Sequence, residues 1–585
     1  LHTLRYQSIL VLSDQDDDGL HIRGLIFNLF HVLWPSLLSI PGFMKYMKTP
    51  LVMASDGTEF FDVASANEYQ QTHPRTKFKY YKGLGGWTTK DMKRMVASID
   101  KYVVSMTGDP AVLSHAFGES TQWRKDMARR PRTAWAVASN THESFDAFAE
   151  EQLSHYFIAS NVRSISDEID GLTPTRRKIV YYLLRQMASK SHGAVKVSQL
   201  AAQIANKLHY HHGEASMVHT IIGLAGDYVG KSIPLLMDNG QFGTRRLGGK
   251  DAAAPRYIFT EGRPVLPFLF RKEDLDILTK LVDEGEEIEP ERFIPTVPYL
   301  LVGWPSGIGA GFASSILPRN VLDVIDCCLG ERTVDSLVPS FPRFQGTVVR
   351  DERRGGRWAT HGVHECQENL LVVTELPIGM WTQKFKTVLL TRELTFTEHH
   401  TEHTVHFRIH HEHPEQLATE LPLTTYFNDQ WVVNRDGAIV TTSIEEVFER
   451  HRAARVQTIQ RRKDHDLERL HHAMEEKEAW LAFLEAEMAG VFPLNATVAQ
   501  CQTICAEHGL RPQLLNRAIA RADKTPRRME QLRASITALK EDHATLSATT
   551  PDALWRAELH ELRAFWTKKR RRFNDGDGTR EERCP

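Results

Sequence analysis

The sequence predicts a multidomain protein in which α/β domains are followed by a long α-helical region. A chain of 585 residues is too long for one hydrophobic core. Near its start, the apolar run 9–12 leads into a polar turn, as the buried parallel strands of α/β domains do. From Ile444 onward, apolar residues recur at heptad-like steps, which is typical of coiled-coil helices.

The composition is that of a globular protein, with 25% charged and 41% hydrophobic residues. The net charge is only −2, so a nucleic-acid site must be a local patch and not a global excess of positive charge. The six cysteines show no paired CxxC spacing of a zinc site, and we interpret them as reduced thiols of an intracellular protein. No apolar run is long enough to cross a membrane, so no membrane association is expected.

An acidic turn, SDQDDDG, follows the first predicted strand. Asp14, Asp16 and Asp18 alternate, so at a strand end their side chains are expected to point to one side. Carboxylates held that close repel one another unless a cation sits among them, and hard oxygen ligands suit Mg²⁺. A calcium EF-hand loop is an alternative, but its twelfth position should be Glu and is Leu25 here. A solvated acidic turn without a ligand is the other alternative. A helix is expected over residues 20–38.

The most informative stretch is QFGTRRLGGKDAAAPRYIFT, residues 241–260. Its glycines allow close backbone approach, and its cations Arg245, Arg246 and Lys250 are suited to phosphates. Tyr257, directly after Arg256, is a candidate nucleophile on phosphorus. A packed tyrosine beside a solvated basic loop is the alternative, because a lone Tyr is usually structural. The segment GTRRLGGKD does not match a phosphate-binding P-loop, since Lys250 stands one place late.

Several motifs, in one order along the chain, resemble the type IIA DNA topoisomerases. DQDDDG with its flanks resembles the metal-binding turn of a TOPRIM domain, and RSISDEIDGLTPTRRK and YHHGE resemble the start and the histidine turn of the winged-helix domain. DAAAPRYIF resembles the active-site segment of the family. TELPIGMWT, at 374–382, resembles the eukaryotic or eukaryote-derived viral enzymes more than bacterial gyrase.

The resemblance implies a fold that is α/β plus α, with a truncated TOPRIM domain. The expected parts are the C-terminal part of TOPRIM (1–104), a connector (105–154), a winged-helix domain with the catalytic tyrosine (155–298), an α+β tower domain (299–443), an antiparallel coiled-coil arm with an exit-gate dimer interface (444–573) and a disordered tail (574–585). The two heptad-like series consist of Ile459, Leu467, Leu470, Met474, Leu481, Leu484 and Met488, and of Leu532, Ile536, Leu539 and Leu546.

The resemblance also implies a chemistry, transesterification of DNA by Tyr257 with Arg256 stabilising the charged transition state. A phenol is barely ionised at neutral pH, so a base is needed, and His211 or His212 is expected to supply it. The family binds a pair of Mg²⁺ ions, for which Asp14, Asp16 and Asp18 are the candidate ligands. The family's metal-binding glutamate, in an EGDSA-like segment, does not precede Asp14 here.

Cations along the chain are expected to hold DNA phosphates. The candidates are Lys82, Arg176, Arg177, Lys178, Lys207, Arg245, Arg246 and Lys250. Ile308 lies between Gly307 and Gly309, as a wedge between base steps would. An ordinary buried Ile in a glycine-rich turn is the alternative.

The expected partners are double-stranded DNA and a second copy of the chain. ATP is expected to act only in a full-length enzyme, because the ATPase region is missing here. The nucleus is the expected location, with a mitochondrion, a kinetoplast-like organelle or a viral factory as alternatives. The basic run KKRRRF (568–573) fits a nuclear-targeting signal, a DNA contact or a solvated tail. Two other functions stay open, a DNA clamp without chemistry and a TOPRIM nuclease.

Overall fold

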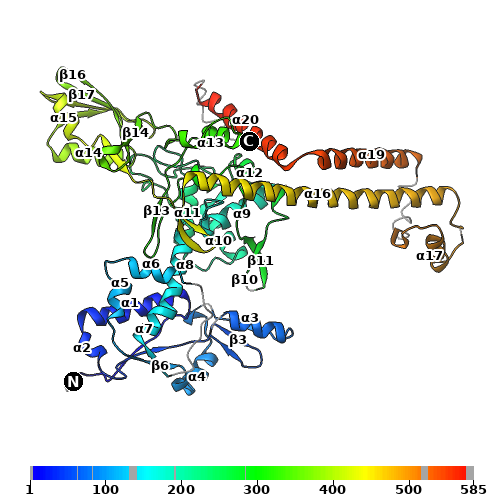
Figure 1. Cartoon of the computed structure of the whole chain (residues 1–585), viewed down its shortest axis with the longest axis horizontal. Helices are drawn as coiled ribbons and strands as arrows, with labels where there is room; N and C mark the ends of the chain where they lie inside the picture. The colour runs from blue at the N-terminus through cyan, green and yellow to red at the C-terminus, as the bar shows by residue number, and fades with distance from the viewer. Residues whose placement is uncertain are drawn as a thin grey trace. The chain divides into compact units, whose positions relative to one another are not determined.

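The computed structural model describes residues 4–61, 63–81, 83–130, 141–189, 193–283, 285–493, 495–514 and 525–574. The chain divides into two compact units (Figure 1). Unit 1 comprises Leu1–Pro267 and Thr279–Glu449, and unit 2 comprises Phe268–Leu278 and Arg450–Pro585. Within the described residues, no helix combines the length and the hydropathy that crossing a bilayer requires.

Unit 1 begins with a mixed four-stranded sheet of order β1-β2-β6-β7. Its strands are β1 (Ile9–Val11), β2 (Met44–Met47), β6 (Val103–Thr107) and β7 (His142–Ser144). The β1–β2 and β6–β7 pairs are parallel and the β2–β6 pair is antiparallel. The helices around it are α1 (Asp17–Leu33), α2 (Pro35–Leu38), α5 (Val112–Phe117), α6 (Gln122–Ala128), α7 (Phe145–Ala147) and α8 (Ser154–Ser164), with a π-helix over Phe148–Leu153 between the last two.

Three expectations for this region are wrong. The helix expected over 20–38 ends at Leu33, because Pro35 disfavours a helical conformation at Trp34 and starts a separate turn, α2. Helix α1 already begins at Asp17, so Asp18 is helical and the strand-like alternation of the aspartates does not hold. The segment 105–154, expected as a connector, instead supplies β7 and part of β6, and it places Phe145 and Phe148 in the core against Phe27.

A smaller antiparallel sheet of order β4-β3-β5 follows the acidic turn in sequence. Its elements are β3 (Val52–Ala54), β4 (Glu59–Phe60) and β5 (Phe78–Tyr80), with α3 (Val63–Thr72) between β4 and β5 and α4 (Thr89–Ala97) after β5. A capping box at Thr88 and Asp91 starts α4.

The next part of unit 1 is mainly helical. Helices α9 (Pro174–Ala188), α10 (Val197–Lys207) and α11 (Glu214–Ala225) pack together, and the two-stranded pairs β8 (Val195–Lys196) with β9 (Phe259–Thr260) and β10 (Lys280–Asp283) with β11 (Glu286–Pro290) accompany them. The helix-start signal at Pro174 and the helix–turn–helix predicted for 197–216 are confirmed. The apolar spacing of Leu200 and Ile204 predicted α10, and both side chains are buried.

Residues 299–443 form short strands, as the sequence predicts, and three helices that the sequence analysis missed. The strands are β12 (Ser306–Ile308), β13 (Ala313–Ser315), β14 (Thr347–Asp351), β15 (Arg357–His361), β16 (Val363–Gln367), β17 (Leu370–Glu375), β18 (Thr395–Glu398), β19 (Phe407–His410), β20 (Thr424–Phe427), β21 (Val432–Arg435) and β22 (Ala438–Thr441). The helices are α13 (Val321–Leu329), α14 (Thr382–Thr391) and α15 (Pro414–Glu420).

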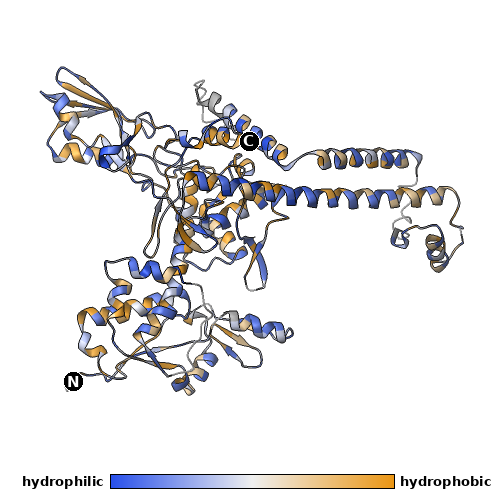
Figure 2. Cartoon of the chain, viewed as in Figure 1, coloured by the Kyte–Doolittle hydropathy of each residue, from blue (hydrophilic) through white to orange (hydrophobic). Residues whose placement is uncertain are grey.

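Unit 2 contains most of the 45-residue helix α16 (Ile444–Met488). It also contains α17 (Val498–Glu507), α19 (Pro526–Ala548) and α20 (Pro551–Asn574). Lys463 contacts the end of α19 and Glu485 contacts Arg533 near its start, so α16 and α19 run antiparallel. Hydrophobic residues are interspersed along both helices, which are otherwise mainly hydrophilic (Figure 2).

The two helical series were predicted from their heptad-like spacing. Leu484 and Leu532 are buried in one cluster, as predicted, whereas Met488 is exposed. The basic run 568–573 lies on α20, and its side chains beyond Lys568 are outside the described residues, as is the predicted tail from 575 onward.

Candidate functional site

The three aspartates of the acidic turn have different partners. Asp14 Oδ1 accepts the Leu84 amide at 2.7 Å, which links the turn to the glycine-rich segment after β5. Asp16 is the N-cap of α1 and accepts the Gly19 amide at 2.7 Å. Asp18 receives two hydrogen bonds from the Arg163 guanidinium, both 2.8 Å long. The turn is therefore ordered by the protein itself.

These environments move the acidities of neighbouring carboxyls in opposite directions. Burial raises the pKa of Asp16, and the charges of Asp14 and Asp18 raise it further against the lowering effect of the Gly19 amide. The Arg163 hydrogen bonds lower the pKa of Asp18, although partial burial opposes them. Asp16 is thus a half-buried carboxylate repelled by its neighbours, a state that a bound cation would relieve.

The fit of these residues to Mg²⁺ is only partial. Among the described residues, no three His, Cys, Asp or Glu side chains are grouped as a metal site requires. Asp16 has the hard oxygen donors and the unfavourable charge that Mg²⁺ would neutralise, whereas Asp18 is neutralised by Arg163. The acidic turn supplies part of a magnesium site and needs further ligands.

A histidine turn between α10 and α11 lies next to the acidic turn. His212 Nδ1 is 3.8 Å from Asp18 Oδ2, and burial together with positive Arg163 lowers the pKa of His212. His211 Nε2 is 2.7 Å from Asp283 Oδ2, on strand β10. His209, which has a left-handed backbone (φ 48°), contacts Asp283 and Glu286 with its two ring nitrogens.

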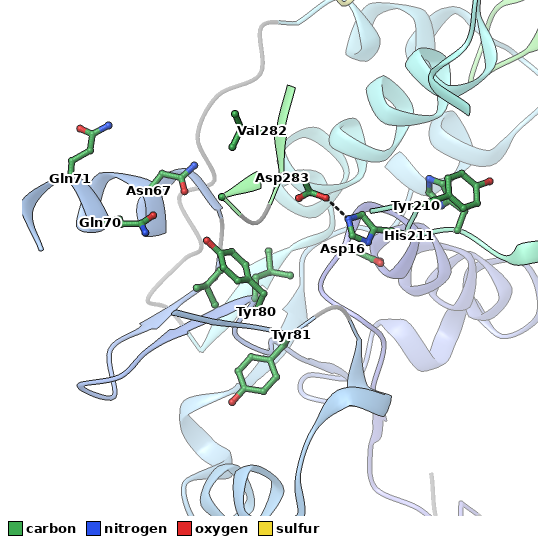
Figure 3. Close-up of a pocket in the computed structure, with 14 residues that line it drawn as sticks. Asp16, Asn67, Gln70, Gln71, Tyr80, Tyr81, Tyr210, His211, Val282 and Asp283 are labelled. Carbon is green, nitrogen blue, oxygen red and sulfur yellow. Dashed lines mark hydrogen bonds and ion pairs between the residues drawn. The ribbon is translucent and has the colours of Figure 1, made fainter. Parts of the chain in front are cut away.

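A cleft of about 870 Å³ opens between this turn and the small sheet. It is lined by Asp16, Leu51, Val52, Asn67, Gln70, Gln71, Tyr80, Tyr81, Tyr210, His211, His212, Val282, Asp283 and Gly285. In Figure 3 the dashed line joins Asp283, on the β10 hairpin, to His211, and Asp16 lies close to that histidine. The cleft therefore has both an acidic turn and a histidine turn on its walls.

Tyr257 and Arg256 lie at the surface. Tyr257 is 66% exposed, and the Arg256 guanidinium lies 4.6 Å from the centre of its ring. The next residue, Ile258, is buried and anchors the segment. The packed-tyrosine alternative is therefore wrong. In the described part of the chain, Tyr257 has no hydrogen bond or ring contact with the acidic or the histidine turn.

The loop before Tyr257 is held by glycines and by a buried ion pair. A Cβ on Gly248 would lie 2.3 Å from the Trp381 ring, and one on Gly249 would lie 2.3 Å from the Tyr228 hydroxyl. Both glycines have positive φ, so they are required by conformation and by space. Arg245 forms a buried ion pair with Glu375 at the end of β17. Arg245 therefore holds the loop in place, and its assignment as a phosphate contact is a misprediction.

Two further cations expected on DNA point into the protein. Arg177 is buried and donates to Asp170 at 2.7 Å. Lys178 donates to Glu289 at 2.8 Å and to the Leu208 carbonyl at 2.6 Å. Both assignments are corrected, because these cations are already paired with buried acceptors.

The other predicted cations remain candidates. Arg176 is half-buried, while Lys207, Arg246 and Lys250 are exposed. Lys82 lies outside the described residues.

Ile308 is 83% exposed at the end of β12, in a hairpin with β13. The glycines beside it are needed for packing, because a Cβ on Gly307 would lie 1.8 Å from the Ser164 carbonyl and one on Gly309 would lie 2.1 Å from Asn161. The hairpin thus lies against the end of α8, and the buried-isoleucine alternative is wrong.

Sequence reasoning missed Arg163, Asp283, Glu375 and Trp381. Arg163 and Trp381 lie within motifs that were recognised, but their partners are far away in the chain, so spacing gave no signal. Asp283 and Glu375 are ordinary strand-end acids in the sequence. Only the three-dimensional fold reveals their contacts.

Comparisons with known proteins agree with these observations. Residues 163–560 match the family model described as DNA gyrase/topoisomerase IV, and residues 47–161 match the C-terminal associated domain of TOPRIM. The chain is 31% identical to a mitochondrial DNA topoisomerase 2 of Dictyostelium discoideum over 98% of this chain and 48% of the relative. It is 31% identical to DNA topoisomerase 2 of Trypanosoma brucei brucei over 96% of this chain and 49% of that protein. The chain therefore spans about half the length of these relatives.

A solved structure is similar over nearly the whole chain. It is the DNA-binding, cleavage and re-ligation domain of Plasmodium falciparum topoisomerase II. The TM-score is 0.82 at 26% identity, with 99% of this chain and 87% of that chain covered.

Proposed function

Because the chain belongs to the DNA gyrase/topoisomerase IV family of type IIA topoisomerases, we propose that it is the DNA breakage–reunion core of a topoisomerase II. The proposed reaction is transient cleavage of both strands of a DNA duplex, passage of a second duplex and religation. The single observation that supports it most is the exposed Tyr257 with Arg256 over its ring, on a loop fixed by glycines and an ion pair.

The proposed chemical step is a transesterification. The Tyr257 oxygen attacks the DNA phosphorus, a bond from phosphorus to the phenolic oxygen forms, and the bond to the 3′ oxygen breaks. The phenol proton passes to His211 or His212, and the departing 3′ oxygen takes up a proton to become a hydroxyl. Arg256 stabilises the charge on the phosphate oxygens. The link is stored as a 5′-phosphotyrosine, so religation is the reverse step.

The acidic turn is the proposed position of Mg²⁺, with Asp14, Asp16 and Asp18 as ligands and a glutamate from outside this chain completing the site. When bound, Mg²⁺ would stabilise the charge on the scissile phosphate and the leaving oxygen. The raised pKa of Asp16 supports this placement, since its cause includes repulsion from the two other carboxylates. Arg163 would then compete with the metal for Asp18.

DNA is proposed to bind through phosphate contacts from Lys82, Arg176, Lys207, Arg246 and Lys250, with Ile308 inserted between base steps. The exposure of Ile308 on a hairpin that lies against α8 supports the wedge.

The finer organisation and setting of the chain are also proposed. The four-stranded sheet and its helices form the TOPRIM part, α9–α11 belong to the winged-helix domain, residues 299–443 form the tower, and α16 and α19 form the arm whose far end is the dimer gate. Each protomer of a homodimer contributes one Tyr257, and ATP acts in the full-length enzyme. The nucleus or a mitochondrion is the proposed location, because relatives include proteins named as mitochondrial.

Trapping of the covalent complex tests the function. The full-length protein is incubated with supercoiled DNA and Mg²⁺, denatured, and examined for DNA linked to protein. We expect an adduct from the wild type and from Tyr6→Phe, a change at another exposed tyrosine, and none from Tyr257→Phe. An equal adduct from Tyr257→Phe would contradict the assignment. DNA breaks without linked protein would indicate a TOPRIM nuclease, and binding without breaks would indicate a DNA clamp.

A further inference from the structure

We propose that Asp283 is a positioning residue that fixes the orientation and the tautomer of His211, and that His211 is the general base for Tyr257. This inference rests on the proposed function. Of the two adjacent histidines, His211 contacts a carboxylate outside the acidic turn, whereas His212 lies beside Asp18.

The geometry of the pair fixes one ring nitrogen. His211 Nε2 is 2.7 Å from Asp283 Oδ2, and a carboxylate only accepts hydrogen bonds, so Nε2 carries the proton. In the neutral ring Nδ1 is then left as the acceptor, free to take a proton from a phenol. The same logic applies wherever an aspartate orients a catalytic histidine.

The strand that carries Asp283 is built to aim this side chain. The pairing of β10 with β11 shifts register between Lys280 and Val282, and such bulges redirect side chains next to active sites. At the other end of the hairpin, Glu289 is almost fully buried and holds Lys178 of α9 at 2.8 Å. The base of the hairpin is thus anchored in the helical core, while Asp283 reaches into the cleft.

Stability alone gives no reason for the contact. The side chains of His211 and Asp283 are 43% and 33% exposed, and exposed ion pairs contribute about 0–1 kcal/mol. Water could satisfy both groups. The effect of the pair therefore falls on where the imidazole points.

The titratable groups around His211 come from three elements. They are Asp283 and Glu286 on the hairpin, His209, Tyr210 and His212 in the turn, and Asp16, Tyr80 and Tyr81 across the cleft. A carboxylate favours the protonated ring, so removing its charge keeps the ring neutral at lower pH. Losing Asp283 should therefore lower the maximal cleavage rate and also shift the acidic limb of the pH profile to lower pH.

The test compares Asp283→Asn, Asp283→Glu and His211→Gln in the full-length protein with Glu287→Gln as the matched control. Glu287 lies on the same hairpin, is exposed and pairs with Lys280 at 2.9 Å, so the charge change is the same without a histidine contact. Adduct formation is followed in time at several pH values, and DNA affinity is measured separately.

We expect Asp283→Asn to slow cleavage about 10- to 100-fold, part of the range that general bases contribute, with DNA affinity within about twofold of wild type. Asp283→Glu should recover part of the rate. In the His211→Gln background Asp283→Asn should have no further effect, because the two residues act as one unit.

Three outcomes would overturn the inference. They are a rate equal to that of Glu287→Gln, a faster rate, which would make Asp283 an inhibitory contact, and an additive loss in the His211→Gln background. If the wild type itself forms no adduct, or Tyr257→Phe forms one, the proposed function fails and not this inference alone.

Discussion

An isoleucine that is 83% exposed is an unusual use of an apolar side chain, and the surroundings of Ile308 explain how it is maintained. Its neighbours Gly307 and Gly309 touch α8 so closely that a larger residue at either position would displace the hairpin. The side chain is therefore held in the solvent by packing on both sides of it. Such an arrangement is useful only if another molecule covers the residue.

We expect Ile308→Ala to reduce DNA cleavage by about tenfold or more while DNA affinity changes little. Unstacking a base step needs a bulky side chain, whereas phosphate contacts dominate affinity. Adduct trapping and a binding titration at one salt concentration measure the two quantities. Val338→Ala, at another exposed aliphatic residue, is the control. A large loss of affinity in Ile308→Ala would be incompatible with a wedge.

At the scale of elements, the strand end of β17 and the start of α14 hold the loop that precedes Tyr257. The Gln383 amide donates to the Arg246 carbonyl at 3.0 Å, the Trp381 ring covers Gly248, and Glu375 pairs with buried Arg245. Residues about 130 positions apart are thereby joined. The exposed cations Arg246 and Lys250 are presented by this loop, so their direction depends on the tower segment.

Glu375→Gln should therefore destabilise unit 1 by about 3–5 kcal/mol, because it leaves Arg245 as a buried and unpaired charge. The urea midpoint of unit 1, followed by hydrogen exchange in peptides from α9 and β17, measures the effect. The control is Glu398→Gln, which removes an acid paired with Lys386 on the surface at 2.6 Å. Replacing both members of the buried pair by apolar residues should restore part of the stability, and a Glu375→Gln midpoint equal to that of the control would refute the role of the ion pair.

At the scale of the whole molecule, local signals in the sequence predicted much of the fold. The helix-start proline of α9, the apolar spacing of α10 and the heptad-like steps of α16 and α19 each depend on residues a few positions apart. The same holds for the glycines around Ile308. These elements were confirmed because the physics that forms them is local.

Long-range partners could not be predicted in this way. Lys178 resembles a phosphate contact until Glu289, 111 positions later, is seen beside it, and Arg245 resembles one until Glu375 is found. The acidic turn shows the same limit, since Arg163, 145 positions away, decides the charge state around Asp18. A cation in a motif is available to DNA only if no buried acid in the fold has already paired with it.

Unit 2 contains a buried charge network that fixes where α16, α20 and the segment 268–278 meet. Arg455, which is fully buried, pairs with Asp274 and Glu558, and Arg462 contacts the same two acids at 2.7 and 2.5 Å. Burial raises the pKa of Glu558, but the two arginines outweigh it and the net pKa is lowered. Such a carboxylate stabilises the fold above its unfolded pKa of about 4.3, and that stability is lost as pH falls through the lowered folded pKa.

Two results are expected from this network. Lowering the pH from 7 to below about 4 should reduce hydrogen-exchange protection in α16 and α20 once rates are corrected for the intrinsic effect of pH. Arg455→Leu should reduce the same protection at neutral pH by about 3–5 kcal/mol, because it leaves two buried acids with one arginine. Arg469→Leu, whose pair with Asp466 is exposed, is the control and should change nothing measurable. If protection in α16 and α20 is the same in Arg455→Leu as in wild type, the network does not hold these helices together, and the apolar contacts between them must do so alone.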